Sequence, residues 1–579
     1  MKIITTLFFL FLYPLFIAAQ SATPNCKELL ENANYYLLQG EYKQALAHYQ
    51  AVQVCDPTFS GSIHKKIHAL FELLYEHRQK GNYPLGNSNL VLDYQNGKYG
   101  YLNAQGKVVF PYEYNTALPF SPSTAHAVVQ KGKHQYWLDS LGQLFLLAKS
   151  VQDLTLKTEV LDLSHQGLET FPSSILRFPK LKFLLLSKNN LSEIPESIDR
   201  LHQLQFLDLE GNKLRALPNS IGNLEQLSYL NLSRNKIMEL PYSFGNLNQL
   251  RVLELSSNNL IQLPEFFGNL SHLERLSFQW NKLQMLPSSF GELSSLEYLD
   301  LRGSELVSLP ESFGELSNLQ TLQLDWNEID YIPKNIENIT KLEYLDLSFK
   351  NLEELPYWIG YFIHLKHLTL SNNLLSTIPE EIGLLTELQH LDLSANQLQL
   401  LPQNIIHLKQ LQYLDISNNE LSTLPLFFEN LTILQELKIG FNSFSSLPES
   451  VGKLTKLTLL DLRLNNLTQL PNSFEQLENL RQLHLENNRL KSIPKALGKL
   501  KKLLYLDLGY NNLETIPESI GKLIYLNHLN LEGNQLSKLP PSILDLVALR
   551  KLRLLNNAIP LEKRAFIEAR LPHCAVAWE

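Results

Sequence analysis

The most constraining feature of this sequence is an asparagine that recurs every 23 residues along roughly its last three quarters. These asparagines are Asn189, Asn212, Asn235, Asn258, Asn281, Asn327, Asn373, Asn396, Asn419, Asn442, Asn465, Asn488, Asn511, Asn534 and Asn557. Gln166, Ser304 and Lys350 occupy the remaining positions of the series, and a proline lies six residues after nearly every position. An unbroken period of this length indicates a solenoid, in which each unit packs on its neighbours.

Each unit follows the pattern LxxLxLxxNxLxxLPxxIxxLxx, as in the stretch from Leu204 through Asn212 to Ile221. The leucines of LxL alternate with polar residues, so we expect them to point into the core from a short parallel strand. An asparagine side chain both donates and accepts hydrogen bonds, so it can satisfy buried backbone groups at the turn that follows. Stacked repeats then form a structural asparagine ladder, which begins with Asn189, Asn212, Asn235, Asn258 and Asn281.

These motifs resemble the leucine-rich repeat, in the 23-residue LPxxI form of the Shoc2, Scribble and plant Ras-group class. The resemblance implies an α/β solenoid: a leucine-rich-repeat horseshoe with a parallel concave sheet, made of 18 units over residues 149–559. A C-terminal cap is expected at 560–579, with a helix from Glu562 to Leu571 and a strand from Cys574 to Trp578. Cys574 is expected to be buried there as a small apolar side chain.

The first 20 residues predict a secretory signal peptide. Lys2 precedes an almost wholly apolar run, which ends at the small residues Ala18 and Ala19. The alternative is an uncleaved anchor helix, but the run is shorter than the ~20 residues that a membrane span needs. No later stretch is apolar enough to span a membrane. The mature chain is therefore predicted to be exported to an oxidising compartment, whether periplasmic, cell-surface or secreted.

Residues 21–82 are predicted to be helical. The spacing of Gly40, Tyr42, Ala45, Tyr49 and Pro57 resembles the second half of a tetratricopeptide repeat. Because antiparallel helices bring the start of one helix close to the end of the next, we expect a disulfide between Cys26 and Cys55. A peptide-binding groove of this family needs several repeats, so a structural role is favoured for this segment.

Residues 83–148 change to a pattern typical of short antiparallel strands, with alternating aromatic residues between Gly-Lys turns. The stretch from Gly97 to Pro111 resembles the WG-type β repeat, with Tyr99 where that family has tryptophan. A second, more divergent copy begins at Gly132. We expect this segment to act as a structural adapter at the N-terminal edge of the solenoid.

Motifs and charge narrow the classes of function. The formal net charge of −8 argues against a general nucleic-acid ligand, which would favour a basic surface. The sequence contains no P-loop, HExxH, GxSxG or paired CxxC motif, so no enzyme activity, cofactor or metal is predicted. What remains is a binding or assembly function.

The residues that flank LxL are expected to project from the concave face. Aromatic residues concentrate there in the middle repeats, and exposed aromatic residues on a rigid surface are typical of binding hot spots. The candidate ligand-binding residues are Trp280, Tyr298, Trp326, Tyr344 and Phe349. The alternative is that the tyrosines and the accompanying aspartates, as in Tyr-Leu-Asp-Leu-Ser, are scaffold residues typical of the repeat. The two tryptophans depart from that pattern.

The sequence therefore predicts an exported, non-enzymatic recognition module that binds a protein, peptide or glycan on its concave face, with no membrane span after signal cleavage. Two alternatives remain. One is a structural, self-assembling envelope protein, and the other is an intracellular signalling scaffold if the signal peptide is not used.

Overall fold

The computed structural model describes residues 90–578, apart from 96, 104–105, 121–125 and 330–331. The predicted signal peptide, the tetratricopeptide-like segment and the Cys26–Cys55 disulfide lie outside the described residues. Contacts between Cα atoms divide the chain into two compact units. Of the described residues, the first unit holds those up to Gln166 together with Pro172–Ser187 and Arg200–Asp208, and the second holds Gly167–Phe171, Lys188–Asp199 and those from Leu209 onward.

The first unit contains antiparallel strands followed by the first parallel strands. Its strands are β1 (Val91–Gln95), β2 (Lys98–Leu102), β3 (Val108–Tyr114), β4 (Thr116–Ala117), β5 (Ala127–Lys131), β6 (His134–Leu138), β7 (Leu144–Ala148), β8 (Val160–Asp162), β9 (Phe183–Leu185) and β10 (Phe206–Asp208), with 3-10 helices η3 (Val151–Asp153) and η4 (Ser173–Arg177). Strands β1–β3 form a separate antiparallel sheet. Strand β7 pairs antiparallel with β6 and parallel with β8, so it joins the antiparallel hairpins to the repeat sheet.

The alternating aromatic residues of this segment form its core. Tyr101 is fully buried and packs edge-on against Phe110 and Phe120, with ring centroids 6.0 and 5.0 Å away. Its hydroxyl donates to the carbonyl of Leu118 at 2.7 Å, which satisfies the one polar group of the side chain. The antiparallel strands expected here are therefore present, while their relation to WG-type repeats stays a prediction.

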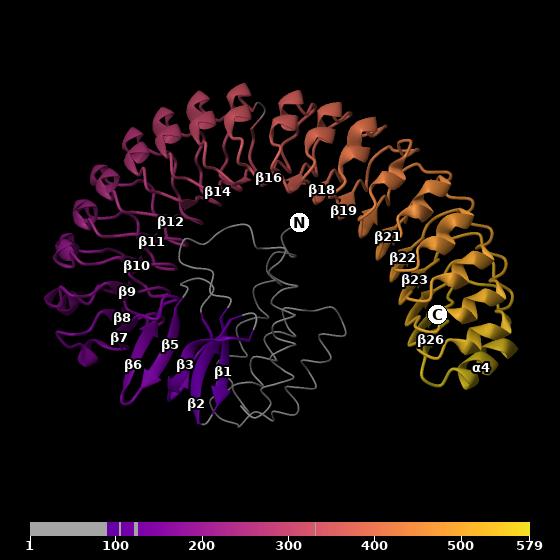
Figure 1. Cartoon of the computed structure of the whole chain (residues 1–579), viewed down its shortest axis with the longest axis horizontal. Helices are drawn as coiled ribbons and strands as arrows, with labels where there is room; N and C mark the ends of the chain where they lie inside the picture. The colour runs from indigo at the N-terminus through magenta and orange to yellow at the C-terminus, as the bar shows by residue number, and fades with distance from the viewer. Residues whose placement is uncertain (1–89, 96, 104–105, 121–125, 330–331, 579) are drawn as a thin grey trace. The chain divides into compact units, whose positions relative to one another are not determined.

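The second unit is a stack of repeats, each with a three-residue parallel strand. Its strands are β11 (Tyr229–Asn231), β12 (Val252–Glu254), β13 (Arg275–Ser277), β14 (Tyr298–Asp300), β15 (Thr321–Gln323), β16 (Tyr344–Asp346), β17 (His367–Thr369), β18 (His390–Asp392), β19 (Tyr413–Asp415), β20 (Glu436–Lys438), β21 (Leu459–Asp461), β22 (Gln482–His484), β23 (Tyr505–Asp507), β24 (His528–Asn530), β25 (Lys551–Arg553) and β26 (Ala575–Ala577). Within this unit the strands line the inner side and the short helices line the outer side (Figure 1).

The outer segments are 3-10 helices and not α-helices. They are η5 (Glu196–Arg200), η6 (Asn219–Asn223), η7 (Tyr242–Asn246), η8 (Glu265–Asn269), η9 (Ser288–Glu292), η10 (Glu311–Glu315), η11 (Lys334–Asn338), η12 (Tyr357–Tyr361), η13 (Glu380–Leu384), η14 (Gln403–His407), η15 (Phe428–Asn430), η16 (Glu449–Lys453), η17 (Asn472–Gln476), η18 (Lys495–Lys499), η19 (Glu518–Lys522) and η20 (Pro541–Asp545). Most begin directly after the repeat proline, and neighbouring helices pack closely: a Cβ atom on Gly222 would lie 2.1 Å from the carbonyl oxygen of Ser243. Such a spacing suits short 3-10 turns.

The solenoid prediction is confirmed: successive parallel strands pair in register, and the leucines of LxL are buried, as Leu230 and Leu253 illustrate. The cap consists of α4 (Leu561–Arg570) and β26, which pairs with β25. Cys574 is partly exposed, so the expectation that it is buried is wrong, and partial burial raises the pKa of its thiol to about 11. Within the part of the chain that the structure describes, no helix has the length and apolarity that a membrane span requires.

Candidate ligand-binding face

The asparagine ladder makes the strands of the second unit a rigid platform. The Asn281 amide donates to the carbonyls of Leu255 and Phe278 at 2.9 and 2.7 Å, and its oxygen accepts from the amide of Leu260 at 3.0 Å. The same three bonds recur at Asn258, so each asparagine ties its own repeat to the preceding one. We use "strand face" for those side chains of β11–β25, and of the three residues after each strand, that point away from the buried leucines.

The residue before each ladder position adopts a left-handed backbone conformation in every repeat, with φ near +50° to +70°. We call these residues the turn row. Glycine and asparagine adopt this conformation most readily, and Gly211, Gly303, Asn372 and Asn418 are examples here. For other residue types the conformation costs about 1 kcal/mol or more.

Five turn-row residues are large aromatic residues, which suit this position poorly. They are Trp280, Trp326, Phe349, Phe441 and Tyr510, and all have exposed side chains. Trp280 and Trp326 are 54% and 53% exposed. Left-handed backbone and exposed apolar surface both oppose folding, so the backbone of the turn does not favour aromatic residues here.

The five aromatic residues singled out from the sequence lie in two parallel rows and do not form one cluster. Trp280, Trp326 and Phe349 belong to the turn row, whereas Tyr298 and Tyr344 belong to strands β14 and β16. Trp326 stacks on Phe349, with ring centroids 4.0 Å apart, and Trp280 lies over Gly303 of the next repeat.

The two tyrosines are more engaged with the scaffold than the tryptophans. The guanidinium carbon of Arg275 lies 3.4 Å from the ring centroid of Tyr298, and burial raises the pKa of Tyr298 to about 12. Tyr344 begins a continuous stack with His367, His390 and Tyr413, in which successive centroids are 4.3, 3.9 and 4.0 Å apart. Because stacking covers the ring faces, this row presents ring edges to a ligand.

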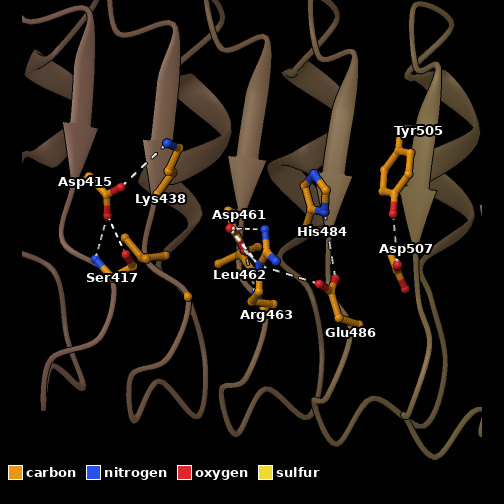
Figure 2. Close-up of polar contacts among 12 residues, drawn as sticks. Asp415, Ser417, Lys438, Asp461, Leu462, Arg463, His484, Glu486, Tyr505 and Asp507 are labelled. Atoms are coloured by element: carbon orange, nitrogen blue, oxygen red, sulfur yellow. Dashed lines mark hydrogen bonds and ion pairs between the residues drawn. The ribbon is translucent and has the colours of Figure 1, made fainter. Parts of the chain in front are cut away.

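Much of the acidic row also has local structural roles. Asp346 accepts from the backbone amide and hydroxyl of Ser348 at 2.9 and 2.6 Å, and Asp415 accepts in the same way from Ser417. These bonds fix the backbone after the strand. From β19 to the residues just after β22, three acids also have cationic neighbours (Figure 2). The Nζ atom of Lys438 lies 3.6 Å from a carboxylate oxygen of Asp415. The guanidinium of Arg463 lies 2.8 Å from a carboxylate oxygen of Asp461 and 3.5 Å from one of Glu486.

The acids between β15 and β18 differ from this pattern. Asp325, Asp346 and Asp392 form no ion pair with any described residue. Burial, followed by the charge of Asp346, raises the pKa of Asp325 to about 7, and burial also raises the pKa values of Asp346 and Asp392. No group of acidic, histidine or cysteine side chains among the described residues is arranged to hold a metal ion.

The ladder is irregular at Ser304 and Lys350, where the turn itself changes. In both repeats the residue after the ladder position, Glu305 or Asn351, is also left-handed. Lys350 is 1% exposed, and its ammonium group donates to the carbonyl of Leu324, the group that an asparagine at this position would reach. Burial lowers the pKa of Lys350 to about 7, against the opposing influence of Asp325 and Asp346.

From the sequence, Lys350 was recognisable as a break in the asparagine series but was not predicted to be a buried cation. Its ladder position could have indicated this, because every ladder position lies at the buried turn. No feature of the sequence indicated that Asp325 would lack an ion pair with a neighbouring side chain. Such pairing depends on the rotamers of neighbouring side chains, and the guanidinium of Arg302 donates two hydrogen bonds to Asp300, at 2.9 and 2.7 Å.

Stacked repeats, a rigid strand face and exposed aromatic residues define a solenoid of the binding-scaffold class. Comparisons with known proteins agree with this. A model of the leucine-rich repeat region matches residues 157–258, 219–299, 265–356 and 350–443, and a leucine rich repeat model matches 432–490 and 478–536. The chain therefore belongs to the leucine-rich-repeat family, whose repeat fold is typically a non-catalytic binding scaffold.

Two bacterial structures are similar to this chain. A leucine-rich-repeat protein of Leptospira interrogans is 32% identical, and the match covers 75% of this chain and 99% of that protein, with a TM-score of 0.55. YopM from Yersinia enterocolitica is 27% identical over 69% of this chain and 83% of that protein, with a TM-score of 0.50. No curated protein matches the sequence at a significant level.

Proposed function

We propose that this chain is an exported, non-enzymatic recognition protein that binds a protein, peptide or glycan partner on its strand face, with Trp280, Trp326 and Phe349 as anchors. One observation carries the proposal: large aromatic side chains occupy exposed, left-handed turn positions that seven other repeats fill with glycine or asparagine, the residues that adopt this conformation most readily. Rigid, exposed aromatic residues are the type that contributes most to binding energy at interfaces.

The test replaces the two tryptophans by the residue that the fold itself prefers. In the Trp280→Gly/Trp326→Gly variant we expect affinity for a partner, captured from envelope and cell-surface extracts, to fall at least tenfold. The melting temperature should not fall markedly, because glycine relieves the left-handed strain. Leu464→Gly, a change at the same backbone position with a non-aromatic side chain, is the control. Affinity measured by calorimetry that is unchanged in the double variant would contradict the proposal.

Export is the second part of the proposal, and it rests on the first 20 residues alone. We expect the mature chain to begin just after Ala19 or Gln20, and N-terminal sequencing of the product in its native host measures this. We also expect Cys26 and Cys55 to be oxidised in that product. Three free thiols in the denatured, unreduced protein would contradict the disulfide.

A further inference from the structure

The strand face has an uneven distribution of charge. At its outward positions after Arg302 and before Lys438, the strand face carries Asp325, Asp346, Asp392, Asp415 and Glu436 but no lysine or arginine. Farther along the same sheet, Lys438 and Arg463 lie next to acids (Figure 2). The interval from β15 to β18 is therefore an acidic part of the face that lacks the cations found beside it.

Asp325 indicates most directly that a cation is missing. Asp325 is 8% exposed, and its buried Oδ1 atom has no hydrogen-bond partner among the described residues. Buried carboxylate oxygens in proteins are normally paired, since an unpaired one keeps the full cost of desolvation. The two neighbouring cations are directed elsewhere, because Arg302 is bound by Asp300 and the ammonium group of Lys350 donates to Leu324.

Aromatic rings lie next to this acidic interval. Trp326 follows Asp325 directly in the chain and stacks on Phe349, and both side chains are exposed. A cation over an indole or phenyl ring is attracted by the electron density of the ring face, and a nearby carboxylate adds a charge-assisted hydrogen bond. Carboxylates beside exposed rings are therefore complementary to lysine and arginine side chains.

We infer that the partner presents a cationic peptide segment to the interval from β15 to β18, where its lysine or arginine side chains pair with Asp325, next to Trp326, and with Asp392, three strands farther along the sheet. The inference rests on the proposed function and specifies the chemistry of the partner at that site. An uncharged glycan could donate hydroxyl hydrogen bonds to Asp325 but would supply no positive charge, and an anionic glycan would be repelled by the acids of this interval.

The direct test uses an octalysine peptide as the probe and the full mature chain as the receptor. We expect octalysine to bind, octaglutamate not to bind, and the Asp325→Asn/Asp392→Asn variant to bind octalysine at least tenfold more weakly. Asparagine retains the oxygen that accepts from Ser394, so the backbone after β18 is kept. The matched control is Glu514→Gln/Asp545→Asn, which removes the same charge from two exposed acids outside the strand face. Equal weakening in both variants would overturn the inference, because attraction would then reflect net charge alone.

A pH titration gives a second readout. The titratable and charged groups around Asp325 are Asp300 in β14, Arg302 just after it, and Tyr344, Asp346 and Lys350 of the β16 repeat. A bound cation favours the ionised form of Asp325, whose pKa in the free protein is about 7, so binding releases a proton and strengthens as the pH rises. We expect affinity for octalysine to increase about tenfold from pH 6 to pH 8 in the wild type and much less in Asp325→Asn. If octalysine affinity depends on pH equally in the wild type and in Asp325→Asn, Asp325 is not the group that pairs with the bound cation.

The two proposals can fail separately. If the captured partner binds the Asp325→Asn/Asp392→Asn variant normally but loses affinity for Trp280→Gly/Trp326→Gly, the recognition function stands and the cationic chemistry is wrong. If the acidic variant loses octalysine and the captured partner is unaffected by the tryptophan changes, the acidic interval binds cations and the proposed anchors are wrong.

Discussion

Replacing Asn511 with alanine is expected to lower the free energy of unfolding by about 4 kcal/mol, one of the largest effects that a single substitution has in this protein. Asn511 is 5% exposed, and its amide donates to the carbonyls of Leu485, Leu508 and Gly509 at 2.9, 3.2 and 3.2 Å. Its oxygen accepts from the amide of Leu490 at 3.0 Å. Alanine removes these bonds without giving the buried backbone groups another partner.

The neighbouring residue provides a matched control. Asn512 is exposed, and its backbone amide, which alanine retains, donates to the carbonyl of Leu490. Asn512→Ala should therefore change stability by less than about 0.5 kcal/mol. Urea unfolding followed by circular dichroism compares the two, and hydrogen exchange at the Leu490 amide shows whether the loss is local. Similar stabilities for both variants would mean that the ladder contributes little.

The fold was predictable because the repeat pattern encodes it redundantly. The ladder asparagines, the alternating leucines and the prolines each indicate the same unit, so the strand and the turn around Asn281 follow from any of them. The left-handed conformation of the turn row was not inferred, since its residues range from Gly303 to Trp280 and share no chemistry. Only the geometry of the turn shows that the aromatic residues there are unfavourable for the fold.

The candidate site was predictable in composition but not in arrangement. The sequence located Trp280, Trp326 and Tyr344 on repeating positions, yet their partners depend on side-chain rotation. Tyr344 joins a ring stack with His367, whereas Trp326 turns toward Phe349. The pairing of charges also depends on side-chain rotation. Asp300 and Asp325 both lie near Arg302, but Arg302 donates only to Asp300. The structure was therefore needed to tell an acid that is paired within the scaffold from one that is not.

Replacing Lys350 with asparagine is expected to raise the free energy of unfolding by about 3 kcal/mol at pH 7. When the pKa of a lysine falls from its ordinary value to about 7 on folding, the free energy of unfolding at pH 7 is lower by roughly 4 kcal/mol than with an exposed lysine. Asparagine carries no charge and can donate to Leu324 as the other ladder residues do to their carbonyls. It also supplies an acceptor for the amide of Ile329, which a lysine cannot provide.

The pH dependence distinguishes this cause from a general gain in packing. Because the folded pKa of Lys350 lies below the unfolded value, the unfolded chain binds more protons between about pH 7 and pH 10, and wild-type stability from this group rises with pH. The advantage of Lys350→Asn should therefore be greatest at pH 7 and shrink toward pH 10, as measured by urea unfolding at both values. Lys282→Asn, at an exposed lysine just after a ladder position, should show neither effect. If Lys350→Asn is instead less stable than the wild type, the turn of this repeat requires the lysine. In that turn Phe349 and Asn351, the residues on either side of Lys350, are both left-handed.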